Sequence, residues 1–316
     1  MDRTRAFERF AWIVLGYAVV VIVWGAVVRA TGSGAGCGQH WPLCNGEVIP
    51  LAPRLATLIE FGHRVSSGII LILSLALVAA AWRTFPRQHQ ARSAALLAFA
   101  FVIVEAAVGA GIVLLKLVEH NASALRAGYV AVHLVNTMLL VGAFTATAWS
   151  ARPHPTTWPV EVRLRWTRWL RYGLIAMLFV SAAGAVVALG DTLFPQATLA
   201  AGLAADFDST SHFLIRLRIW HPVLAAATSV YLIVVISRSD ALDAPRLRGP
   251  ARLVIALIAG QVLLGVVNLV ALAPLALQMA HLLVSNALWV ALIWIWLMIR
   301  STPGATSGPA GDVRSR

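Results

Sequence analysis

Long apolar stretches alternate with short polar connections along the whole chain. Eight windows approach the roughly 20 mostly apolar residues that a helix needs to cross a bilayer, and they lie near 11–29, 66–82, 94–115, 127–149, 169–190, 213–236, 252–272 and 275–299. The connections leave no room for a separate soluble domain. The pattern predicts an all-α integral membrane protein with eight transmembrane helices.

Composition supports this prediction and narrows the class of protein. Hydrophobic residues make up 59% of the 316 residues and charged residues only 12%, whereas soluble domains have about 45–50% and about 25%. These proportions exclude a soluble enzyme. The first window follows a basic stretch, as in a signal peptide, but it is too long for such a segment and lacks a convincing cleavage site. We therefore expect it to be a retained first helix.

The net charge of +12 indicates topology rather than nucleic-acid binding. Most Arg residues lie at the N-terminus, in 83–92, 152–171 and 238–252, and at the C-terminus, whereas 191–208 is acidic. Because positive loops stay in the cytoplasm, both termini are predicted to be cytoplasmic in a multi-pass protein of the cell membrane. The Gly-, Pro- and Ser-rich tail 301–316 is predicted to be disordered.

The two halves of the chain share motifs in the same order, which indicates an internal duplication. The matches pair Gly25–Val28 with Gly184–Val187, Glu105–Gly109 with Gln261–Gly265, His63 with His221, and His133 with His281. Each half has an even number of spans, so the repeats share one orientation. The sequence thus predicts two parallel four-helix bundles, residues 1–150 and 151–300, related by a pseudo-two-fold axis along the membrane normal.

Four histidines lie near the start of the even-numbered spans, toward the outer side of the membrane: His63, His133, His221 and His281. Ionisable residues inside a membrane are costly and mark functional sites. The remaining histidines fall in loops, where a solvated imidazole is the simpler interpretation. Two facing histidines in each bundle suit a haem iron held between two imidazoles. A Cys-x-x-Cys-His motif is absent, which excludes covalent attachment of haem.

Several charged residues lie beside these histidines. Haem propionates need cations, and the candidates are Arg64, Arg216 and Arg218, for which interfacial snorkelling is the alternative. Glu60 lies three residues before His63 and therefore on the same helix face. Glu-x-x-His also occurs in di-iron bundles, but too few further acids lie inside the spans. Only the first half has a Glu here, which suggests one reactive pocket and one that binds haem or transfers electrons.

The first outer loop contains both cysteines of the chain, Cys37 and Cys44. They lie on the oxidising side of the membrane, where a disulfide persists. Two interpretations stay open: a structural staple of the loop, or a redox-active disulfide near the reactive pocket.

Taken together, these motifs resemble the haem A synthase family. The resemblance covers residues 10–299 and is carried by Thr31–Cys37, by Trp41-Pro-Leu-Cys44-Asn-Gly, by Glu60-Phe-Gly-His63-Arg64, and by the other three histidines. It implies oxidation of a ring methyl of haem O to the formyl group of haem A. It also implies haem O on His63 and His133, haem b on His221 and His281, and Glu60 nearest the chemistry. This chain lacks the second cysteine pair of some relatives.

The resemblance further implies partners: haem O as substrate, the haem O synthase that makes it, and cytochrome oxidase assembly factors, all within membrane lipid. A homo-oligomer is allowed by the sequence. Two other functions remain to be weighed, a di-haem b-type electron-transfer protein without substrate chemistry and a haem chaperone or transporter. Both account for the four histidines, but neither accounts for Glu60 or the unequal repeats.

Overall fold

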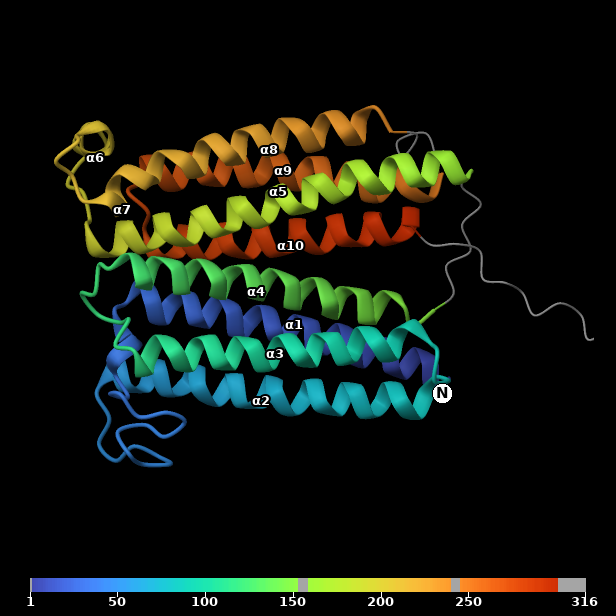
Figure 1. Ribbon diagram of the computed structural model, residues 1–316, viewed down its shortest axis with the longest axis horizontal. Coiled ribbons are helices and arrows are strands. Elements are labelled where there is room, and N and C mark those ends of the chain that lie inside the picture. The colour runs from blue at the N-terminus through green and yellow to red at the C-terminus, as the bar shows by residue number, and fades with distance from the viewer. Residues whose placement is uncertain (1, 153–158, 240–244, 301–316) are drawn as a thin grey trace, which may run out of the picture.

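The computed structural model describes residues 2–152, 159–239 and 245–300, and the predicted disordered tail 301–316 lies outside them. The described chain forms long, roughly parallel rods (Figure 1). In chain order these are α1 (Arg3–Ala30), η1 (Ser33–Ala35), α2 (Leu55–Thr84), α3 (Gln90–Leu114), α4 (Ala124–Trp149), α5 (Val160–Leu193), α6 (Leu199–Phe207), α7 (Phe213–Arg216), η2 (Leu217–Ile219), α8 (Trp220–Ser237), α9 (Pro245–Val270) and α10 (Leu275–Arg300).

The prediction of eight spans is confirmed. Eight helical segments of the described chain are long and apolar enough to cross a membrane, and α7, η2 and α8 together form one of them, Phe213–Ser237. Several helices extend beyond their apolar windows. Near the predicted site, the helix whose start differs most from its window is α2, which begins at Leu55 rather than near residue 66. The polar residues before the window are therefore helical, and they include the Glu60 and His63 pair.

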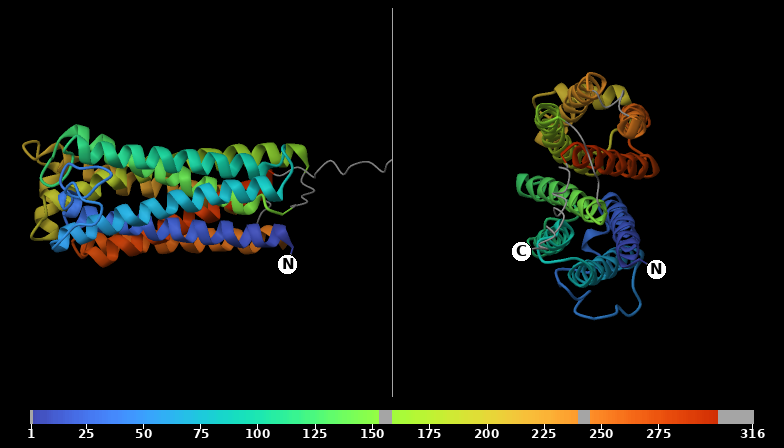
Figure 2. Two further views of the ribbon diagram at one scale, coloured as in Figure 1. Left: turned by 90° about the horizontal axis from the view of Figure 1, so that it is seen from below. Right: turned by 90° about the vertical axis from the view of Figure 1, so that its right-hand side faces the viewer.

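The helices form two bundles with the same order of contacts. In the first bundle α1 packs on α2, α2 on α3, α3 on α4, and α4 on α1; in the second, α5, α8, α9 and α10 close an equivalent ring. The end-on view in Figure 2 shows the two rings beside each other. This arrangement is compatible with the predicted duplication, while the pseudo-two-fold axis itself stays a prediction.

The bundles meet along α4, which packs on α5 and α10, and along α1, which packs on α10. The Trp289 indole of α10 donates a hydrogen bond to the Met138 carbonyl oxygen of α4 at 2.6 Å and is almost completely buried. A β-carbon at Gly142 would lie 3.4 Å from this indole nitrogen. One apolar core runs through both bundles, so they pack as parts of a single molecule.

All the loops that carry predicted site residues lie at one end of the rods, on the left in Figure 1. We call this the loop end, and it comprises residues 31–54, 115–123, 194–212 and 271–274. Within α2, α4, α8 and α10, the four histidines of the sequence prediction lie in the part of the helix nearest this end. The predicted site residues of the two bundles are therefore gathered at the same level of the molecule.

Candidate functional site

His63 and His221 occupy matching places, each pressed against a glycine of the neighbouring helix. A β-carbon at Gly25 of α1 would lie 2.9 Å from Cε1 of His63, and one at Gly184 of α5 would lie 2.9 Å from Cε1 of His221. These separations are closer than side chains tolerate, so only glycine leaves room for each ring where it lies. The two glycines open the repeated Gly-Ala-Val-Val motif, and its conservation between the halves now has a steric reason.

His133 and His281 form a second matching pair. Cε1 of His133 would lie 3.8 Å from a β-carbon at Gly109 of α3, and Cε1 of His281 would lie 3.3 Å from one at Gly265 of α9. The glycines again belong to a repeated motif. Each of the four histidines is thus set against a glycine of the preceding span in its own bundle.

The helices that carry each pair of histidines lie at opposite corners of their ring. In the second bundle the rings of His221 and His281 have centres 6.4 Å apart and planes inclined at 80°. The Nδ1 atom of His221 lies 3.1 Å from the carbonyl oxygen of Val180. That contact occupies Nδ1 and leaves Nε2 of His221 available to a ligand.

Other ring nitrogens in the described part of the chain are buried without a hydrogen-bond partner. They are the imidazole atoms Nδ1 of His63, of His133 and of His281; Nδ1 of His133 faces Oε1 of Glu105 at 3.4 Å without a hydrogen bond. Buried polar atoms are nearly always satisfied in folded proteins, and an exception needs an explanation such as a bound ion. Both bundles therefore contain imidazole nitrogens that are suited to take a ligand.

Glu60 is held by the loop that contains the disulfide. Its side chain is 5% exposed; Oε2 accepts the backbone N–H of Cys37 at 2.8 Å, and Oε1 accepts the Nε–H of Arg64 at 3.1 Å. Cys37 and Cys44 form a disulfide, as predicted. The acid expected nearest the chemistry is thus buried beneath the disulfide loop, one helical turn from His63.

Arg64 is the residue that ties this loop to α2. Besides its bonds to Glu60, its Nη1 donates to the carbonyl oxygens of His40 at 2.5 Å and Leu43 at 2.6 Å. The predicted interaction of Arg64 with a haem propionate stays a prediction. In this structure its N–H groups donate to Glu60 and to the two loop carbonyl oxygens.

The other two predicted propionate partners differ from each other. Arg216 ends α7 and is exposed. Arg218 lies in η2 with its side chain 10% exposed, and it forms ion pairs with Asp206 at 2.8 Å and Asp191 at 3.2 Å. Of the two, Arg216 is the exposed one.

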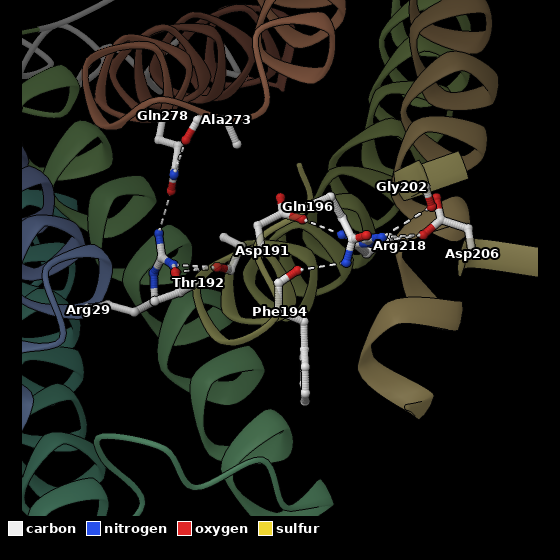
Figure 3. A network of polar contacts seen from close by, with 11 residues as sticks. Arg29, Asp191, Thr192, Phe194, Gln196, Gly202, Asp206, Arg218, Ala273 and Gln278 are labelled. Atoms are coloured by element: carbon white, nitrogen blue, oxygen red, sulfur yellow. Dashed lines mark hydrogen bonds and ion pairs between the residues drawn. The ribbon is translucent and has the colours of Figure 1, made fainter. Parts of the chain in front are cut away.

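Sequence reasoning missed a polar network between the two bundles, shown in Figure 3. Arg29 of α1 donates through Nη1 to the Ala188 carbonyl oxygen at 2.5 Å and to Oγ1 of Thr192 at 2.7 Å, both in α5. Its Nη2 donates to Oε1 of Gln278 in α10 at 2.9 Å. The only sequence signal was an Arg at the end of the first span, which also fits ordinary snorkelling.

Two loop histidines that we expected to be merely solvated have structural roles. His89 accepts the N–H of Ala91 at 3.2 Å and caps α3, and His212 accepts the N–H of Leu214 at 3.3 Å and caps α7. Both rings are partly exposed, and each also has a structural role, because one ring nitrogen satisfies an N–H that the first helical turn leaves unpaired.

Comparisons with known proteins identify the family of this chain. The model of a family described as "Cytochrome oxidase assembly protein" matches residues 8–293, which is nearly all of the described chain. The chain belongs to this family. Membership in the cytochrome oxidase assembly family also agrees with the sequence resemblance to haem A synthases.

Individual relatives add detail. A "Protoheme IX farnesyltransferase" of Thermus thermophilus is 41% identical over 299 residues, covering 93% of this chain and 49% of the relative. A "Heme A synthase" of Halalkalibacterium halodurans is 32% identical over 198 residues, 63% of each chain. Another of Bacillus mycoides is 41% identical over 95 residues, 30% of each chain. The chain thus spans about half the length of its Thermus relative.

Proposed function

We propose that this protein is a haem A synthase, which oxidises a ring methyl of haem O to the formyl group of haem A by successive hydroxylations for cytochrome oxidase assembly. One observation carries the proposal: four histidines are set against four glycines at matching places in two bundles. Membership in the cytochrome oxidase assembly family and the similarity to proteins named heme A synthase support it.

The histidines fit a haem best in the second bundle, where the ring centres of His221 and His281 lie 6.4 Å apart, which would leave room for one metal ion between them. In the first bundle the support is the buried, unpaired Nδ1 atoms of His63 and His133. A backbone carbonyl on Nδ1, as at His221, is typical of a histidine that binds metal through its other nitrogen. His221 and His281 would hold haem b, and His63 and His133 would hold haem O.

The unequal surroundings of the two pairs support placing the substrate in the first bundle. Glu60 lies three residues before His63, whereas Arg218 lies three residues before His221 and is paired with Asp191 and Asp206. Only the first pair therefore has a buried carboxylate next to it in sequence. The disulfide loop covers that carboxylate, which keeps water from surrounding it.

The chemistry divides between the haem group and the chain. A haem held by these histidines would supply or relay the oxidation, and the protein would orient the group and tune its potential. Glu60 stabilises positive charge as it develops at the methyl carbon under oxidation, and it accepts a proton from the water that adds there. The Cys37 N–H and the Arg64 guanidinium keep its carboxylate in place. Arg216, exposed at the loop end, would pair with a propionate.

The setting of the reaction follows from the same arrangement. With both termini in the cytoplasm, the loop end and its haem pockets face the outer side of the cell membrane. Haem O would come from a protohaem farnesyltransferase, and the name of the longer Thermus relative favours such a neighbour. The haem A product would pass to cytochrome oxidase assembly factors.

Two other functions are weighed against this one. A di-haem electron-transfer protein needs the four histidines but gives no role to Glu60. Farnesyl transfer to protohaem is favoured by the name of the Thermus relatives, which applies to proteins about twice the length matched. Both alternatives predict that the chain, supplied with haem O, makes no formyl haem.

The test is to express the full chain with a source of haem O and to identify the extracted haems by chromatography and mass. We expect haem A with the wild type, and bound haem without haem A for Glu60→Gln. The matched control Glu119→Gln changes an exposed carboxylate at the same end and should convert normally. Finding only haem B and haem O in wild-type protein that binds both would overturn the proposed function, and full conversion by Glu60→Gln would remove Glu60 from it.

A further inference from the structure

The histidines of α4 and α10 each meet a polar side chain from the preceding span, but the two side chains differ in charge. Glu105 of α3 lies beside His133, with Oε1 3.4 Å from Nδ1. Gln261 of α9 lies beside His281, with Nε2 3.1 Å from Nε2 of the ring. These residues open the repeated motif whose last residue is the glycine under the same histidine. The duplication thus conserves the position and changes a carboxylate into an amide.

Glu105 is surrounded by hydrogen-bond donors that stabilise a negative charge on its side chain. Its Oε2 accepts the side-chain amide of Asn136 at 2.5 Å, and its Oε1 accepts the hydroxyl of Thr137. Both carboxylate oxygens are used as acceptors, which suits the ionised form. The residue three after His281 is Val284, which offers no donor where Asn136 stands in the first bundle. The second bundle therefore has neither the carboxylate nor the matching amide donor.

A carboxylate beside a metal-binding histidine changes the reduction potential of the metal, because its charge acts through the imidazole ring. At 3.4 Å from the ring, and without a hydrogen bond to it, a carboxylate stabilises positive charge on the imidazole and on iron, which favours the oxidised state. Net charge and hydrogen bonds near the ligands are among the means by which a protein sets the potential of an iron site. Gln261 is uncharged and meets the other ring nitrogen, Nε2 of His281, so it lacks this effect, and the two iron sites would be unequal even with identical haems.

We propose that Glu105 is a positioning residue that acts through His133 and holds the reduction potential of iron in the first bundle below that of iron in the second. The inference rests on the proposed function only in requiring haem on these histidines. An electron then moves favourably from the first bundle to the second, which is the direction that oxidation of a substrate in the first bundle requires. The charge difference between Glu105 and Gln261 sets this direction.

The test uses the full-length protein loaded with haem B in both bundles and measures potentials by redox titration of the visible spectrum. A His221→Ala preparation keeps only the first site, and it therefore shows which of the two redox transitions belongs to which bundle. Glu105→Gln should raise the potential of the first site and leave the second unchanged. Gln261→Glu should lower the second and leave the first unchanged. We expect each change to shift the reduction equilibrium tenfold or more, which is about 59 mV for one electron.

The outcomes separate this inference from the proposed function. Potentials that stay unchanged in both variants while haem remains bound would overturn the role of Glu105, even if haem A is still made. Shifts of the expected sign in a protein that makes no haem A would support the role and reject the synthase. Should Glu105→Gln fail to fold, Gln261→Glu alone decides, since it adds the charge rather than removing it. A wild-type chain that binds no haem overturns both.

Discussion

The absence of a side chain at Gly25 lets the imidazole of His63 lie against the backbone of α1. A methyl group there would come within 2.9 Å of Cε1 and 3.1 Å of Nε2. In Gly25→Ala the ring must move, and because a ring at the end of a side chain moves easily, the fold should survive. We expect haem affinity in the first bundle to fall at least tenfold, or about 1.4 kcal/mol, as measured by haem titration of purified protein.

The repeat supplies a control for this prediction. A β-carbon at Gly109 would stand at 3.8 Å from His133, an ordinary van der Waals distance, so Gly109→Ala should bind haem nearly as the wild type does. Equal losses in both variants would show that the small residues act on helix packing in general, and not on the ring of His63.

At the scale of single residues, the sequence predicted the candidates better than their partners. Histidines and acids inside apolar spans stand out because burying them is costly. Their contacts could not be read the same way: Cys37 meets Glu60 only because a loop folds back over α2. Thr137 likewise reaches Glu105 across 32 positions of sequence. Such contacts depend on how helices pack, which hydrophobic periodicity does not encode.

The disulfide loop is the element that covers Glu60, and Gly36 sets how closely it lies on α2. A β-carbon at Gly36 would come within 2.4 Å of the Ala56 carbonyl oxygen. Because backbone atoms cannot move aside cheaply, Gly36→Ala should lift the loop and break the bond from Cys37 to Glu60. We expect faster hydrogen–deuterium exchange at the Cys37 amide and less haem A per protein.

A neighbouring glycine provides the matched control for the loop. Gly34 would place a β-carbon 3.4 Å from Cγ1 of Val118, which is ordinary contact with a side chain. Gly34→Ala should therefore leave both the exchange rate and the product yield near wild type. If Gly36→Ala exchanged at the wild-type rate, the loop would not be seated by this contact.

The elements themselves were predicted well, and their ends poorly. Each of the eight apolar windows corresponds to a helical segment long enough to span a membrane, since length and hydropathy alone identify a span. The windows stop where polar residues enter, although the backbone continues as helix, and so α2 gains the turns that carry Glu60 and His63. The 3-10 segment η2 before His221 was not predicted, although the sequence holds a signal for it: Pro222 has no N–H to donate to the carbonyl oxygen of Arg218, four residues earlier in η2.

At the scale of the whole molecule, Arg29 joins the two bundles at the loop end. It donates to α5 and to α10, and a hydrogen bond with one charged partner stabilises by about 1.5–3 kcal/mol. Arg29→Met should therefore lower the midpoint of thermal unfolding in detergent by several degrees, compared at one scan rate because such unfolding is often irreversible. Haem in the individual bundles should be less affected.

The comparison that isolates this effect is Arg87→Met, which removes a charge from an exposed position between α2 and α3. Its midpoint should match that of the wild type, since exposed single charges contribute little. If both variants melted together, net charge rather than the bridge between the bundles would account for the loss.

The partners of Arg29 also bear on how the protein is made. The contacts with Ala188 and Gln278 span 159 and 249 positions of sequence, so α1 is synthesised long before α5, and α10 comes last of all. During insertion the Arg29 guanidinium therefore lacks these two acceptors while the rest of the first bundle enters the membrane. The N-terminal half is therefore not a finished unit when it leaves the ribosome, and the contacts of Arg29 are complete only once α10 is in place.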